Sequence, residues 1–65
     1  MTAYEFTKIT DILDDLDAIE RERCDKHLSL NPGDTRRLSD AQHYQQAIAD
    51  VRRTLRKAFQ AQQQV

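Results

Sequence analysis

Hydrophobic residues recur every three or four positions along most of the chain, with one break near the middle. In the first half the repeat consists of Phe6, Ile9, Ile12, Leu13, Leu16 and Ile19. In the second half it consists of Ala41, Tyr44, Ile48, Val51, Leu55 and Ala58, with Phe59 beside them. This spacing places each set on one face of an α-helix, so the pattern predicts two amphipathic helices.

The break coincides with the single proline and the single glycine of the chain, in Asn31-Pro32-Gly33-Asp34. Proline presets φ at the second position of a type II turn and glycine accepts the positive φ of the third, so these four residues predict such a turn. Thr2 and Glu5 have the spacing of a capping box, which starts the first helix at residue 3. The second helix has two candidate starts, with Asp34 as N-cap or at Ser39, where another capping box begins.

We therefore expect one all-α domain over residues 1–65, an antiparallel two-helix hairpin. Its expected parts are a helix at 3–28, a turn at 29–38, a helix at 39–61 and a frayed polar tail at 62–65. Two helices touch along only one line, and the apolar arc of the first helix is wider than one partner helix covers. A chain this short also buries little surface alone, so the hairpin is predicted to dimerise into a four-helix bundle. The expected core and dimer seam consists of Phe6, Ile9, Leu13, Leu16, Tyr44, Ile48, Val51, Leu55 and Phe59.

Charge is divided unequally between the two halves, although the net charge is only −1. Residues 1–30 contain eight acidic and four basic residues, whereas residues 31–65 contain three and six. An antiparallel hairpin brings these opposite charges together, which favours that topology. The basic end of the second helix is also a candidate nucleic-acid patch, formed by Arg52, Arg53, Arg56 and Lys57. Neutralisation by the acidic first helix is the favoured interpretation of this patch.

Three charged or polar residues continue the stripe of the first helix where leucine or isoleucine would be expected: Glu20, Arg23 and His27. In one interpretation the helix leaves the core near the turn, and these side chains form a solvated face. In the other they form a polar layer near the bundle seam, which fixes the dimer register or receives another protein. They are therefore the candidate partner-binding residues.

The chain offers few groups for catalysis or metal binding. Cys24 and His27 lie one helical turn apart, and His43 could approach them across the hairpin. A structural zinc site takes four nitrogen or sulfur ligands, so this set is incomplete. One glycine excludes a glycine-rich phosphate loop, and a hairpin offers little concavity for a Cys–His nucleophile. We expect no enzymatic activity, no cofactor and no metal.

The hydropathy of the chain argues against a membrane location. No apolar run approaches the ~20 residues that cross a bilayer, and the N-terminal residues lack the basic start and apolar centre of a secretion signal. The single cysteine suits a reducing compartment. We expect a cytoplasmic protein without a membrane partner.

The opening segment MTAYEFTKITDILDDLDAIERER, followed by one turn and a basic second helix, resembles the small helical accessory proteins of the early regions of lambda-like temperate phages. The resemblance implies a protein that modulates host processes or the choice between lysis and lysogeny by contacting host or phage proteins. The resulting hypothesis is a non-enzymatic regulatory protein that acts by protein-protein interaction. The alternative is a small nucleic-acid-binding regulator that uses the basic end of the second helix.

Overall fold

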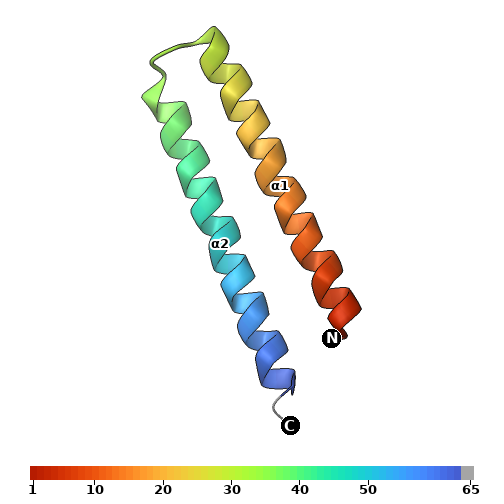
Figure 1. Cartoon of the computed structure of the whole chain (residues 1–65). Coiled ribbons are helices and arrows are strands. Elements are labelled where there is room, and N and C mark those ends of the chain that lie inside the picture. The colour runs from red at the N-terminus through yellow and green to blue at the C-terminus, as the bar shows by residue number, and fades with distance from the viewer. Residues whose placement is uncertain (64–65) are drawn as a thin grey trace.

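The computed structural model describes residues 1–63 and contains two α-helices, α1 (Ala3–Leu30) and α2 (Thr35–Gln63). The helices run antiparallel, side by side, and one short turn joins them, so the start of α1 and the end of α2 lie at the same end of the hairpin (Figure 1). Its Cα atoms extend 51 × 17 × 7 Å. No strand occurs in the described residues, which confirms the all-α prediction.

The start of α1 has the predicted capping box. Thr2 Oγ1 accepts a hydrogen bond from the Glu5 N–H at 3.1 Å, and Glu5 Oε1 accepts one from the Thr2 N–H at 3.0 Å. These bonds satisfy two backbone donors that the first turn of a helix leaves unpaired. The bond from the Thr2 backbone N–H is also the main reason that the pKa of Glu5 lies below its ordinary value.

The turn is shorter than the sequence pattern predicts, and both helices extend beyond their expected ends. Residues 35–38, which we expected in the turn, form the first turn of α2. Of the two candidate starts, Asp34 is the N-cap: its Oδ1 accepts the Arg37 N–H at 3.1 Å, and Ser39 lies inside the helix. At the other end α2 continues to Gln63 instead of 61, while residues 64–65 of the predicted frayed tail lie outside the described residues.

The turn itself has the geometry that its proline and glycine predict. Gly33 has φ +93°, and the Asp34 N–H donates to the Asn31 carbonyl at 3.2 Å, as the fourth residue of a type II turn does to the first. The Asn31 N–H and side-chain amide both donate to the His27 carbonyl, at 2.8 and 3.1 Å. Asn31, the first residue of the β-turn, therefore satisfies a carbonyl group in the last helical turn of α1.

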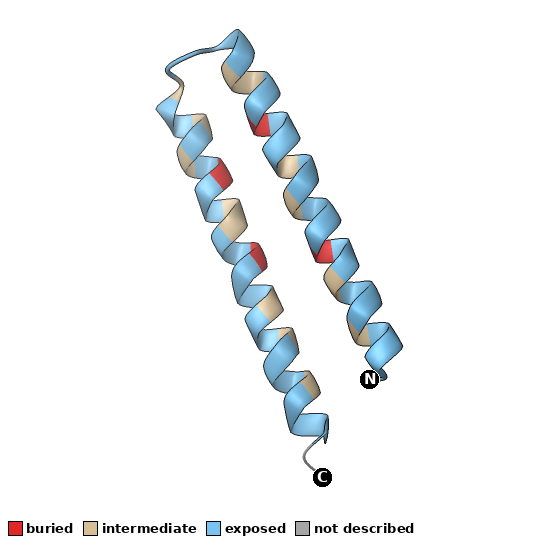
Figure 2. Cartoon of the chain, in the orientation of Figure 1, coloured by how far each residue is buried: buried red, intermediate tan, exposed pale blue. Residues whose placement is uncertain are grey.

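Few side chains are buried between the helices. Only Leu13, Cys24, Ala41 and Ile48 are buried among the described residues, and they line the gap between the two ribbons (Figure 2). Near the open end, the rings of Phe6 and Phe59 stack with their centroids 4.5 Å apart. The predicted core and dimer seam thus divides into two groups. Two of its members are buried, Leu13 and Ile48, and four are half-buried: Phe6, Tyr44, Leu55 and Phe59. The other three, Ile9, Leu16 and Val51, are exposed.

Candidate functional site

The inner side of α1 is more polar than its apolar stripe suggests. The α1 residues that are buried or half-buried at alternating spacings of four and three are Phe6, Thr10, Leu13, Asp17, Glu20, Cys24 and His27. The line of contact with α2 is therefore rotated away from the isoleucine stripe, and polar residues occupy part of the helix-helix seam.

Glu20 is paired across the hairpin with Arg37. Arg37 Nη1 donates to Glu20 Oε1 at 2.6 Å. The Glu20 side chain is only 13% exposed and the Arg37 side chain only 21%. This hydrogen bond raises the pKa of Arg37 above its ordinary value, against the opposing effect of burial. A charged pair removed from water is stabilised only when both partners are present, so Glu20 and Arg37 form one polar unit in the seam.

His27 belongs to the turn. Its Nε2 lies 2.7 Å from Asp34 Oδ2, and both side chains are a little more than one third exposed. The hydrogen bond with His27, followed by the bond from the Arg37 backbone N–H, lowers the pKa of Asp34 below its ordinary value. Asp34 thus joins the end of α1 to the start of α2, as N-cap of one helix and side-chain partner of the other.

Arg23 has an environment different from those of Glu20 and His27. It is exposed, and no hydrogen bond or ion pair to it occurs within the part of the chain that the structure describes. The structure therefore does not bring the three candidate partner-binding residues together in one layer. The sequence pattern did not predict that Arg37 is the partner of Glu20, because the longer predicted turn placed Arg37 outside the second helix.

The basic end of α2 is partly neutralised within the chain. Arg52 donates to Asp14 across the hairpin, and Arg53 bonds Asp50 one turn earlier in α2 at 3.2 Å. Arg56 and Lys57 are exposed, without an ion pair inside residues 1–63. Two members of the candidate nucleic-acid patch are therefore engaged by acidic residues, one on each helix.

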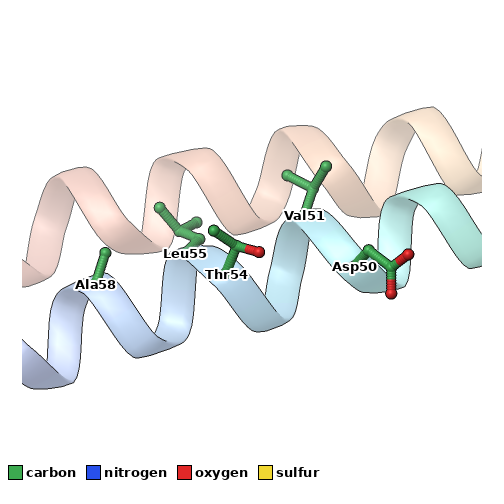
Figure 3. A pocket seen from close by; sticks show the side chains of 5 residues that line it. All are labelled: Asp50, Val51, Thr54, Leu55 and Ala58. Carbon is green, nitrogen blue, oxygen red and sulfur yellow. The ribbon is translucent and has the colours of Figure 1, made fainter.

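A row of exposed aliphatic residues follows α1 beside its contact with α2: Ile9, Ile12, Leu16 and Ile19. Their exposed fractions run from 37% to 57%. On α2 a groove of about 430 Å³ is lined by Asp50, Val51, Thr54, Leu55 and Ala58. Figure 3 shows Val51, Leu55 and Ala58 pointing toward α1, whereas Asp50 points away from it. The four residues of the row and Val51 are exposed in the hairpin, and Leu55 is half-buried.

The aliphatic row and the groove lie on the same side of the hairpin. Successive helical residues are about 100° apart, so Asp14 and Leu16 fall on opposite flanks of the α1 seam. By the same count Arg52 and Val51 fall on opposite flanks of the α2 seam. Because Asp14 bonds Arg52 on one side, Leu16 and Val51 share the other. We call that side the apolar face: Ile9, Ile12, Leu16, Ile19, Val51, Leu55 and Ala58.

The candidate metal ligands are dispersed. Cys24 is buried, His27 is bonded to Asp34, and His43 is exposed. Over residues 1–63 no three His, Cys, Asp or Glu side chains are arranged to hold a metal ion. In the same range neither helix combines the length and the apolar character needed to span a bilayer.

No protein family, curated protein or solved structure matches the chain.

Proposed function

We propose that this chain is a non-enzymatic regulatory protein of the cytoplasm, that its working form is a homodimeric four-helix bundle, and that it acts by protein-protein interaction. One observation supports this proposal above the others: the apolar face exposes more large aliphatic side chains than the hairpin buries. Exposed apolar surface of this extent is typical of interaction sites. The phage resemblance of the N-terminal segment favours a host or phage protein as the regulated partner.

The second part of the proposal is a partner site at the turn end. Glu20 and His27 are bonded to other residues of the chain, so they shape this end, whereas Arg23 is exposed and has no ion pair within residues 1–63. Lys26 and Arg36 are also exposed there. The same end exposes the acidic residues Glu22 and Asp25, so its surface carries charges of both signs. A surface of complementary charge on another protein fits this end, since charge complementarity steers association.

A pull-down with the tagged chain from the host cytoplasm, with and without nuclease, tests the function. Lys26→Ala should weaken capture of that protein while keeping the helical content and the mass of the parent, because Lys26 is exposed at the turn end and lies outside the apolar face. Arg21→Ala is the matched control, because Arg21 is exposed on the same helix and bonds Asp17 at 3.5 Å on the other flank. Equal capture by both variants would remove the turn end from the interaction surface.

Nucleic-acid binding remains the alternative, because Arg56 and Lys57 are exposed near the open end of α2 and a dimer would display them twice. Phosphate binding releases counterions, so the logarithm of affinity would fall with the logarithm of salt by ~0.9 per neutralised phosphate of duplex DNA. Capture that disappears after nuclease treatment, together with such a salt slope, would favour this alternative.

A further inference from the structure

We propose that the apolar face is covered by a second copy in antiparallel orientation, with the two-fold axis crossing α1 at Asp14 and α2 at Val51. In this arrangement α1 packs on α1 of the second copy, and α2 packs on α2. The inference rests on the homodimer of the proposed function and adds its orientation and register.

The residues of α1 are symmetrically placed about position 14. Ile12 and Leu16 lie two residues on either side of it, and Ile9 and Ile19 lie five residues on either side. An antiparallel α1–α1 contact centred there therefore sets each exposed aliphatic residue against another aliphatic residue. Such contacts at spacings of three and four form the seam of an antiparallel helix pair.

The charges that border this row are complementary in the same register. Glu5 and Arg23 lie nine residues before and after position 14, on the flank that carries the aliphatic row, and both are exposed. The antiparallel contact places each Glu5 beside Arg23 of the other copy, at both ends of the interface. Opposite charges at the ends of a helix seam select orientation and register, so this pairing favours a second copy as the occupant.

The residues of α2 are complementary in size about Val51. Ala47 and Leu55 lie four residues on either side of it, and Tyr44 and Ala58 lie seven residues on either side. An α2–α2 contact centred on Val51 thus sets a large side chain against a small one at each level. The groove beside Leu55 and Ala58 lies where Tyr44 of the second copy would enter (Figure 3).

The two centres coincide in the folded hairpin. The stacked rings of Phe6 and Phe59 lie eight residues from positions 14 and 51 respectively, and Asp14 is bonded to Arg52, the residue that follows Val51. Positions 14 and 51 therefore lie at the same level along the hairpin. One two-fold axis can therefore pass through both centres, although each was located from the residues of its own helix. A two-fold dimer requires this coincidence, because every contact must occur twice.

Disulfide cross-linking of Val51→Cys tests the orientation. A residue on the two-fold axis faces its own copy, so this variant should form a covalent dimer under mild oxidation, seen on a non-reducing gel. The parent chain is one control, because its Cys24 is buried within the hairpin. Ala49→Cys is the other, since Ala49 is exposed on α2 on the opposite flank. Neither control should cross-link at a comparable rate.

Two outcomes would overturn the arrangement. Cross-linking of Val51→Cys no faster than Ala49→Cys, together with mixed disulfides between Leu16→Cys and Val51→Cys chains, would show that α1 packs on α2 of the second copy. A sedimentation mass of one chain for the reduced variants at all concentrations would also overturn it, and would remove the dimer from the proposed function. A dimer with mixed disulfides alone leaves that function intact.

The charge pairing has its own measurement. Arg23→Glu places like charges together at both ends of the interface, so its dimer dissociation constant should exceed that of Arg23→Ala by roughly two- to fivefold at low salt. Added salt should close the difference, because exposed charges are screened. Equal dissociation constants for the two variants at low salt would contradict the proposed register.

Discussion

At the scale of single residues, the turn is the most closely determined part of the chain. Gly33 supplies the positive φ, and Asp34 caps α2 while its other oxygen meets His27. Each role follows from a chemical property of that residue type: the missing Cβ of glycine and the short carboxylate of aspartate. Substitutions at these two positions therefore separate backbone effects from charge effects.

Gly33→Ala should destabilise the fold through the backbone alone. No atom lies within 4 Å of the position that a Cβ would take at Gly33, so the cost comes from φ +93° and is about 1–2 kcal/mol. Gly33→Asn should cost less, because asparagine adopts positive φ more readily. Urea unfolding followed by circular dichroism measures both free energies. Equal stability of the alanine variant and the parent would contradict the turn geometry.

Asp34 should make stability dependent on acid. Its folded pKa lies below the ordinary value of 3.8, so between the two values the unfolded chain holds a proton that the folded chain does not. Its contribution is complete well above pH 3.8 and is lost as the pH falls through the folded pKa. Asp34→Asn keeps an N-cap without the carboxylate. The difference in Tm between parent and variant should therefore shrink as the pH falls below about 5; a constant difference would assign the effect to capping alone.

At the scale of elements, the sequence predicts more of the helices than of their contact. The periodic residues, the capping box and the Pro-Gly pair are local signals, so two helices and one turn could be predicted. The apolar arc of α1 is too wide to show which part of it faces α2. That rotation depends on contacts between residues far apart in the sequence, among them the pairs Glu20–Arg37 and Asp14–Arg52 and the buried Leu13 and Ile48.

The candidate sites were predictable to the same extent. The stripe analysis located Glu20 and His27 as polar residues near the seam, but not their partners Arg37 and Asp34. The predicted turn ran to residue 38, four residues too far, so Arg37 was not expected in the second helix and its pairing with Glu20 was not predicted. The groove on α2 could not be predicted either, because it depends on which flank of each helix remains uncovered.

Asp17 lies in the contact between α1 and α2 and destabilises that contact. Its Oδ1 is buried and has no hydrogen-bond partner, while Oδ2 lies 3.5 Å from Arg21 Nη2. Replacing such a group by an apolar residue removes a desolvation penalty. Asp17→Leu should therefore raise the free energy of unfolding by about 1 kcal/mol. The control Asp15→Leu, at an exposed position of α1, should change it by less than about 0.5 kcal/mol. A loss of stability in Asp17→Leu would mean that Asp17 has a partner in the working form.

At the scale of the whole molecule, the hairpin has two unlike sides. One carries the Asp14–Arg52 pair, and the other is the apolar face. A 65-residue monomer with only four buried residues among those described has little core from which to gain stability. Covering the apolar face would supply the missing burial, at about 25 cal/mol for each Å² removed from water.

Ile12→Asp separates the hairpin from the dimer. Ile12 is 57% exposed in the hairpin, so a charge there should be harmless to an isolated monomer. In the dimer the same charge is buried without a partner, which is strongly unfavourable. The variant should sediment as a single chain and unfold at a lower temperature than the parent. Ala18→Asp is the control, since Ala18 is exposed on the other side of α1. Matching behaviour of the two variants would contradict the role of the apolar face.

Sedimentation equilibrium of the parent chain at micromolar concentration is the most direct measurement of the central claim, that a second copy covers the apolar face. We expect twice the chain mass, with a Tm that rises as protein concentration increases, because dissociation accompanies unfolding. A single-chain mass with a sharp melt at a Tm independent of concentration would contradict the claim.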